Sequence, residues 1–232
     1  MEKKTRLIDK ILTIVFIIVS VLFILSCSIF TPLMNRPFYY SQIDKLNIVE
    51  TLNTYTHEDY TKDDVIEAFD DVMDFIWKGT EFKTGKLKYS ESGKSHFEDC
   101  VGLFWLDFIV LIVSSIILVT LLILHFIKII RIKDIKGFSP LFLSGIITVG
   151  LVVALGVFGL INFDLLFECF HKVFFPGKDN WVFDYRYDEV ILILPEEFFM
   201  NCAIMIGSTL FILSFVSIGY GVAKKIRKGK LD

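Results

Sequence analysis

The chain has 232 residues, of which 54% are hydrophobic and 15% aromatic, and its mean hydropathy is +0.61. This composition excludes an ordinary soluble domain and indicates a membrane protein. The formal net charge is −3, and no basic patch is interleaved with aromatic residues, so we expect no nucleic-acid partner.

Four apolar stretches are long enough to cross a bilayer as helices. Lys and Arg gather in the segments between or beyond these stretches on one side, while acids dominate the segments on the other side, as the positive-inside rule requires. The expected organisation is a cytoplasmic N-terminus with the first span (1–30), an extracytoplasmic insert (31–95), the second span (96–130), a cytoplasmic loop (131–137), the third span (138–162), a second extracytoplasmic loop (163–197), the fourth span (198–223) and a cytoplasmic tail (224–232).

The sequence therefore predicts an all-α membrane protein, a four-transmembrane-helix bundle with an extracytoplasmic cap domain, in the plasma membrane. The first span has a rival interpretation as a cleaved signal peptide, because the residues from Ile24 to Cys27 are similar to a lipoprotein cleavage box. The length of the apolar run and the membrane-embedded remainder of the chain favour a span.

Two local patterns predict how the helices begin and pack. Thr61 followed by Asp64 indicates a helix start in the insert. The helix that follows carries an apolar face, which we expect to cover the membrane part: Val65, Phe69, Val72 and Ile76. Small residues in the third span are expected to permit close contacts between helices: Gly145, Gly150, Gly156 and Gly159.

The start of the second span carries a histidine. Ser95 and Glu98 have the spacing of a capping box, which predicts that the helix begins there and that His96 lies in its first turn, with Asp99 three residues on. Deeper in the same helix, Asp107 precedes a charge-free apolar run. An intramembrane acid is a functional candidate by default; the alternative is a structural acid paired with an asparagine or a hydroxyl group.

The second extracytoplasmic loop carries the other histidine of interest. The stretch from Phe163 to Phe174 predicts a helix that is too short to span a bilayer and long enough to lie in its surface. Asp164, Glu168 and His171 fall on one stripe of this helix. Carboxylates one turn from an imidazole can orient it and raise its basicity. The alternative is an amphipathic surface helix whose polar stripe is only solvated.

The motifs of two common hydrolase classes are absent from the sequence. The chain has no G-x-S-x-G elbow and no H-E-x-x-H motif, so neither a serine hydrolase nor a zinc protease is expected. The preferred interpretation has no metal and no cofactor. A metal site remains an alternative, built from His96, His171, Asp164 and Asp99. The four cysteines show no CxxC pair, and a disulfide between Cys100 and Cys169 is allowed.

Two blocks of the sequence resemble a known family. These are HFED, from His96 to Asp99, and DLLFECFHKVFF, from Asp164 to Phe175, followed by NWVFD and YDEVILILPEEFF. Together with the four-span layout, they are similar to the integral membrane family that includes the lipoprotein intramolecular transacylase. The resemblance implies that one ester-linked acyl chain of a diacylglyceryl-cysteine moves to the cysteine's own α-amino group, which gives a lyso-form lipoprotein.

The same resemblance implies the site and the partners. His96 and His171 would be the catalytic pair, facing the outside, and the partners would be a diacylated lipoprotein substrate and membrane lipid, with the protein a monomer. The supporting acids would be Asp99, Asp164, Glu168 and Asp107, and the site would be shaped by Trp181, Tyr185, Arg186 and Asp188. The alternatives are a non-catalytic membrane interaction protein with an acidic cap and a metal-dependent membrane lipid hydrolase.

Overall fold

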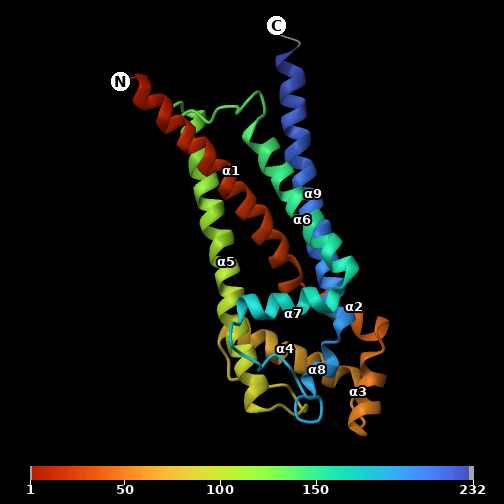
Figure 1. Ribbon diagram of the computed structural model, residues 1–232. Coiled ribbons are helices and arrows are strands. Elements are labelled where there is room, and N and C mark those ends of the chain that lie inside the picture. Colours follow the sequence, from red (N-terminus) through yellow and green to blue (C-terminus); the bar gives the residue numbers. More distant parts are fainter. Residues whose placement is uncertain (1, 230–232) are drawn as a thin grey trace. The chain divides into compact units, whose positions relative to one another are not determined.

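The computed structural model describes residues 2–229, which are helical apart from loops and one isolated β-bridge between Ile135 and Phe138. Residues 230–232, part of the expected cytoplasmic tail, lie outside the described range. Figure 1 shows the helices, which are α1 (Glu2–Leu33), α2 (Arg36–Lys45), α3 (Ile48–Thr56), α4 (Lys62–Lys78), α5 (Glu91–Phe126), α6 (Pro140–Ile161), α7 (Phe163–Phe174), α8 (Val190–Ile193) and α9 (Glu196–Lys228).

Four of the described helices are long and apolar enough to cross a membrane. The candidate spans are Leu7–Leu33, Glu91–Phe126, Pro140–Ile161 and Glu196–Arg227. The prediction of an all-α, multi-pass membrane protein is confirmed. The chain divides into two compact units, which are described separately below. Unit 1 is Met1–Thr31, Asp107–Phe158 and Met205–Asp232, and unit 2 is Pro32–Leu106 and Gly159–Ile204.

In unit 1, α6 and α9 run side by side (Figure 1), and two glycines lie where they are in close contact. A Cβ atom on Gly145 of α6 would lie 2.8 Å from the backbone oxygen of Ser214. A Cβ atom on Gly221 of α9 would lie 2.6 Å from the Cβ of Phe142. Each helix therefore presents a glycine where the other helix leaves no room for a side chain, as close packing in a membrane requires.

The other glycines of the third span do not contribute to this contact. At Gly150 and Gly156, a Cβ atom would meet nothing within 4 Å, so the expectation that they allow close helix contact is wrong. Gly159 belongs to unit 2, where a Cβ atom would lie 3.0 Å from Leu166 of α7. Gly221, in contrast, was not expected as a contact residue.

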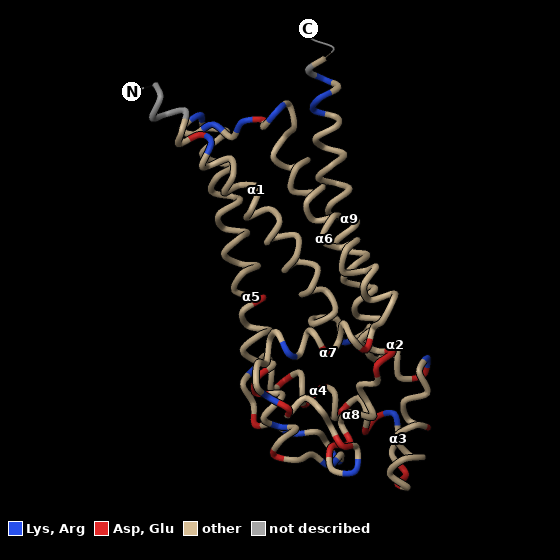
Figure 2. Tube along the Cα trace, viewed as in Figure 1, with Lys and Arg blue, Asp and Glu red and all other residues tan. Residues whose placement is uncertain are grey.

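The basic residues of unit 1 gather at one end, where α1 starts and α9 finishes (Figure 2). Two acids at this end are paired: Lys133 Nζ lies 2.6 Å from Asp9, and Lys224 Nζ lies 2.7 Å from Asp134. The backbone N–H of Lys133 also donates to Thr13 Oγ1 of α1 at 3.0 Å. These contacts hold the loop between α5 and α6 against α1 and α9.

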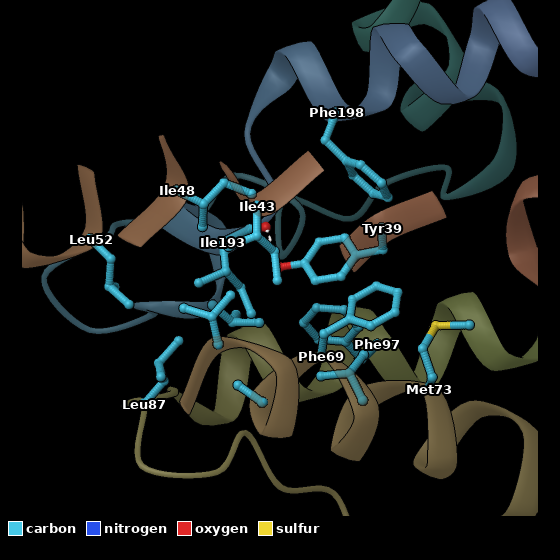
Figure 3. Close-up of a cluster of buried hydrophobic side chains, with 14 of the residues drawn as sticks. Tyr39, Ile43, Ile48, Leu52, Phe69, Met73, Leu87, Phe97, Ile193 and Phe198 are labelled. Atoms are coloured by element: carbon cyan, nitrogen blue, oxygen red, sulfur yellow. Dashed lines mark hydrogen bonds between the residues drawn. The ribbon is translucent and has the colours of Figure 1, made fainter. Parts of the chain in front are cut away.

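Unit 2 has its own hydrophobic core, built by α2, α3, α4, α8, the first turns of α5 and α9, and the segment before α5 (Figure 3). The Tyr39 ring stacks on Phe69 with centroids 3.6 Å apart, and its hydroxyl donates to the Ile193 carbonyl oxygen at 2.8 Å. The predicted start of α4 is confirmed, because Thr61 and Asp64 form a capping box. The apolar face of α4 packs into this core.

A buried carboxylate joins three segments of unit 2. Glu189 is 2% exposed and accepts hydrogen bonds at 2.9 Å from the Tyr60 hydroxyl and from both the backbone N–H and the Nζ of Lys88. Burial tends to raise the pKa of Glu189, but these hydrogen bonds keep the pKa below its ordinary value. The charged form is therefore the one that the fold stabilises, and it ties the loop before α8 to the segment before α5.

The second span does not begin at the predicted capping box. Helix α5 begins at Glu91, and Ser90 caps it, because Ser90 Oγ accepts from the Gly93 N–H at 3.0 Å. Asp188 in turn accepts from Ser90 N at 2.7 Å and from Ser90 Oγ at 2.9 Å. The expected start at Ser95 and Glu98 is therefore wrong, and His96 lies in the second turn of the helix.

Candidate active site

Unit 2 brings His96 of α5 and His171 of α7 together. Their ring centroids lie 5.7 Å apart, and the side chains are 7% and 6% exposed, respectively. Helix α7 spans Phe163–Phe174, with the predicted bounds, and the Asn162 side chain caps its first turn by accepting from Leu165 N at 2.9 Å. Because His171 is buried, the alternative of a polar stripe that is only solvated does not describe this residue.

Aromatic side chains surround the two imidazole rings. The Phe175 ring contacts both histidines, with centroids 5.1 Å from His96 and 5.8 Å from His171. Phe183 meets His96 edge-on at 5.5 Å, and Trp181 stacks on His171 at 4.6 Å. This aromatic enclosure excludes water from the rings and supplies apolar surface beside the two reactive groups.

The contacts of His171 fix which ring nitrogen carries the hydrogen. Its Nδ1 lies 2.8 Å from the backbone carbonyl oxygen of Phe167, one turn earlier in α7. A carbonyl oxygen only accepts, so Nδ1 donates and Nε2 holds the free lone pair of the neutral ring. Burial lowers the pKa of His171, partly offset by this hydrogen bond. The neutral ring is therefore the favoured form near neutral pH.

His96 makes a different set of contacts. Its Nε2 lies 3.5 Å from Cys100 Sγ, one turn later in α5. Its Nδ1 is buried and has no hydrogen-bond partner among the described residues. A buried ring nitrogen without a partner costs free energy unless a ligand engages it. His96 thus presents an unsatisfied nitrogen in an otherwise apolar enclosure.

The three acids expected to orient the histidines are engaged by other groups. Asp99 forms an ion pair with Lys178 and accepts a hydrogen bond from Asn180 Nδ2 at 2.9 Å. Glu168 pairs with Lys172, one turn later in α7. Asp164 accepts a hydrogen bond from the protonated carboxyl group of Glu196 at the start of α9. The group that orients His171 is the Phe167 carbonyl oxygen and not a carboxylate.

Asp99 instead anchors the loop that follows α7. Lys178 and Asn180 both come from this loop, and Asn180 Nδ2 also reaches Ser95 Oγ at 3.4 Å. Trp181 and Phe183, two of the aromatic residues that contact the histidines, follow in the chain between Asn180 and α8. Trp181 is itself braced by a hydrogen bond from its Nε1 to the Lys178 carbonyl oxygen at 2.9 Å. Asp99 is thus connected to the histidine pair through the position of the loop.

Of the four residues expected to shape the site, Trp181 contacts a histidine, and the other three have partners elsewhere in unit 2. Tyr185 packs edge-on against Tyr55 at 5.2 Å. Arg186 pairs with Asp184. Asp188 is 5% exposed and caps α5 through Ser90, so it positions the helix that carries His96.

Asp107 belongs to unit 1. The Ser26 hydroxyl of α1 interacts with its carboxyl group, while Oδ2 is buried without a hydrogen-bond partner among the described residues. This arrangement agrees with the alternative in which a hydroxyl group pairs with the intramembrane acid. A role of Asp107 in activity stays a prediction.

The structure also bears on the cysteines and on metal binding. Cys100 and Cys169 are both free thiols, so the disulfide that the sequence allows is not formed. Within residues 2–229, no group of three or more His, Cys, Asp or Glu side chains is arranged to hold a metal ion.

Sequence reasoning missed five residues of the site: Phe167, Phe175, Lys178, Asn180 and Phe183. Asn180 and Phe183 lie in the block NWVFD, whose resemblance to the family does not by itself predict these contacts. The signal that could have found them is the dense alternation of polar and aromatic residues in a loop of a membrane protein, since an exposed loop rarely carries so many aromatic side chains.

Comparison with known proteins places the chain in a family. Residues 14–199 match the family model described as lipoprotein intramolecular transacylase Lit. The in meso structure of Lit from Bacillus cereus is similar, with a TM-score of 0.82 and 26% identity over 97% of this chain and 99% of that chain. A variant of that protein with one histidine replaced by arginine gives a TM-score of 0.77 at 25% identity, over 97% of this chain and 94% of that chain.

A second relative also matches over part of its length. An uncharacterized protein of Aquifex aeolicus (strain VF5) is 28% identical over 155 residues, which span 66% of this chain and 66% of that protein. The family match extends from within the first span to the start of the fourth, and it includes both histidines. The resemblance noted in the sequence is confirmed, and the chain belongs to the lipoprotein intramolecular transacylase (Lit) family.

Proposed function

We propose that His171 and His96 together carry out the acyl transfer of this protein. The chain is a lipoprotein intramolecular transacylase, an acyltransferase that moves an ester-linked acyl chain of a diacylglyceryl-cysteine to the cysteine's own α-amino group and leaves a lyso-form lipoprotein. The observation that carries the proposal is the buried pair of imidazole rings with centroids 5.7 Å apart. This spacing lets both rings reach one ester group and one amine.

His171 is the general base in this proposal. The amine attacks as the free base, and its nitrogen must lose a proton as the new C–N bond forms. The Nε2 lone pair of His171 takes that proton, because Nδ1 is committed to the Phe167 carbonyl oxygen. The same nitrogen then returns the proton to the glyceryl oxygen when the ester C–O bond breaks. The protons balance, and His171 ends in its starting form.

His96 is the hydrogen-bond donor to the developing oxyanion. In this proposal the Cys100 thiol donates to His96 Nε2, so Nδ1 carries the hydrogen, and this nitrogen has no partner among the described residues. A donor aimed at the ester carbonyl oxygen is satisfied only when substrate is present, and it contributes most when the oxygen becomes negative. Burial strengthens this interaction, because little water competes for the donor.

The site faces the outside of the cell membrane in this proposal. The described Lys and Arg residues of unit 1 cluster at the end where α1 starts and α9 finishes, which supports a cytoplasmic location for that end. Residues 31–95 and 163–197 then lie outside, and a diacylated lipoprotein and the outer-leaflet lipid are the partners. Cysteine labelling at position 178 from outside intact cells tests this orientation.

The decisive experiment compares two substitutions at each histidine. Mass spectrometry of lipoprotein N-termini measures the conversion of the diacyl form to the lyso form by the purified, reconstituted protein. Replacing His171 by Ala or by Gln should each lower turnover about a hundredfold or more, because neither side chain is basic. His96→Gln should retain more activity than His96→Ala, because an amide can still donate to an oxyanion.

The matched control is His57, the C-cap residue of α3, which has φ of 57°. His57→Asn keeps a residue that tolerates this left-handed backbone and should leave turnover unchanged. Equal activity of His171→Gln and wild type would remove His171 from the role of base. Equal loss in His96→Gln and His96→Ala would show that His96 transfers a proton and does not act as a hydrogen-bond donor alone.

A further inference from the structure

Unit 1 contains an open hollow where α5 ends, separate from the histidine pair. Its volume is about 440 Å³, and it is lined by the last residues of α5 and the loop that follows: His125, Phe126, Lys128, Ile130, Arg131, Ile132 and Lys133. Three of these side chains are cationic and one is an imidazole. The other lining side chains are apolar or aromatic, so the hollow combines positive charge with apolar surface.

The backbone builds this hollow by folding back over the end of the helix. Ile129 N and Ile130 N both donate to the Leu124 carbonyl oxygen, at 3.0 and 3.3 Å. Lys128 adopts a left-handed conformation with φ of 65°, which makes the turn possible. The Ile132 N–H then donates to His125 Nδ1 at 3.2 Å and closes the loop around the ring.

These contacts leave donors available in the hollow. Since Nδ1 of His125 accepts from Ile132, Nε2 of the neutral ring carries a hydrogen and is a donor. Lys128 and Arg131 are exposed, and neither has an ion-pair partner among the described residues. Two acids whose side chains are described at this end, Asp9 and Asp134, are already paired with Lys133 and Lys224. The hollow therefore has a local excess of positive charge.

The surroundings distinguish a lipid from a soluble anion. Large apolar side chains at the edge of the hollow are widely exposed: Phe126 is 76%, Ile129 is 69% and Ile127 is 57% exposed. We propose that the hollow binds the phosphodiester headgroup of an anionic membrane phospholipid, whose acyl chains lie against these apolar residues and the end of α5. Basic hollows beside spanning helices suit such headgroups, and Arg131 can hold a phosphate through two parallel hydrogen bonds.

The test titrates the purified full-length protein in detergent with phosphatidylglycerol and measures the bound lipid by native mass spectrometry. Phosphatidylcholine, with a zwitterionic headgroup, and inorganic phosphate are titrated in parallel. Wild type should bind phosphatidylglycerol about tenfold more tightly than phosphatidylcholine, and the double substitution Lys128→Gln/Arg131→Gln should weaken phosphatidylglycerol binding about tenfold. Both side chains are exposed. Gln and Lys have the same branching at Cβ, so Lys128→Gln should not add strain at the left-handed backbone of position 128.

The matched control removes one Lys and one Arg that do not line the hollow. Lys136 is exposed and also left-handed, with φ of 50°, and Arg227 is exposed near the end of α9. Lys136→Gln/Arg227→Gln should keep phosphatidylglycerol binding within about twofold of wild type, if the hollow and not the net charge binds the lipid.

Three results would overturn the proposal. Equal weakening in the control variant would show that only the overall positive charge matters. Equal binding of phosphatidylcholine would remove the preference for an anionic headgroup, and displacement of the lipid by inorganic phosphate at equal concentration would identify a soluble anion as the ligand. If the double variant unfolds, the single variants Lys128→Gln and Arg131→Gln replace it, each expected to weaken binding about threefold.

Discussion

The indole of Trp181 lies over the imidazole of His171, with ring centroids 4.6 Å apart and planes inclined by 24°. Because the indole covers the proposed base, Trp181→Ala should admit water and let the ring turn, lowering the rate of lyso-lipoprotein formation up to about tenfold. Trp181→Phe keeps a stacking partner and should retain most of the rate. Equal rates for all three proteins would show that the indole has no part in positioning His171.

The pKa of His171 offers a second prediction. Burial lowers this pKa below the ordinary value of 6.5, so the folded protein binds the proton more weakly than the unfolded chain does. The free energy of unfolding should therefore fall as the pH decreases from about 6.5 toward the lowered pKa, and His171→Gln should remove this part of the pH dependence. Carbon-13 NMR titration of labelled histidine should give a midpoint below 6.5 for His171. A midpoint above 6.5 would contradict the burial of the ring.

The ion pair between Asp99 and Lys178 predicts coupled effects on turnover. Lys178 is 48% exposed at its side chain, so the pair contributes about 1 kcal/mol or less. Asp99→Asn and Lys178→Met should each lower turnover about fivefold at most, and the double variant should be no worse than either single variant. Hydrogen exchange in residues 176–183 should increase in all three.

Unit 2 also contains a second ion pair that serves as a control for the Asp99 and Lys178 variants. Asp44 of α2 and Lys62 at the start of α4 also form an exposed ion pair. Asp44→Asn should change neither turnover nor exchange in residues 176–183. Additive losses for the Asp99 and Lys178 variants would mean that Asp99 acts on the histidines by a route other than Lys178.

The contact between α6 and α9 predicts opposite effects at two glycines. Gly145→Ala places a methyl group 2.8 Å from the Ser214 carbonyl oxygen, so it should destabilise the protein by about 1–3 kcal/mol. Gly150→Ala meets nothing within 4 Å and should be neutral or stabilise the helix by up to about 1 kcal/mol. Thermal unfolding in one detergent measures both. A stable Gly145→Ala variant would show that the two helices can separate at this point.

The features of the fold that could be predicted are those encoded locally. Length and hydrophobicity located the four spans, and the apolar periodicity after Asn162 gave the bounds of α7. The start of α5 could not be predicted, because the Ser90 cap depends on Asp188, 98 residues away in the sequence. The glycines of α6 show the same limit. Composition gives the number of small residues, but only the neighbouring helix decides that Gly145 is in contact and Gly150 is not.

The candidate site was predictable to a similar degree. The resemblance and the helical spacing pointed to His96 and His171, and the fold brings their rings together. The partners of these rings were assigned wrongly, because carboxylates at helical spacing are visible in a sequence while their competing partners are not. Glu168 forms an ion pair with Lys172, and Asp99 forms one with Lys178. The catalytic roles of the two histidines stay a prediction until turnover is measured.

The acceptor that holds His171 Nδ1 is the main-chain oxygen of Phe167. Every amino acid carries such an oxygen, so alanine scanning can never delete it, and no alignment column can reveal it. Only a change to the main chain itself would weaken it. Incorporation of an α-hydroxy acid at position 168 turns the carbonyl of Phe167 into an ester carbonyl, which is a poorer acceptor, while His171 and its neighbours stay in place. The helical backbone of α7 thus supplies the acceptor that orients the proposed base. This acceptor is present whatever side chain stands at position 167.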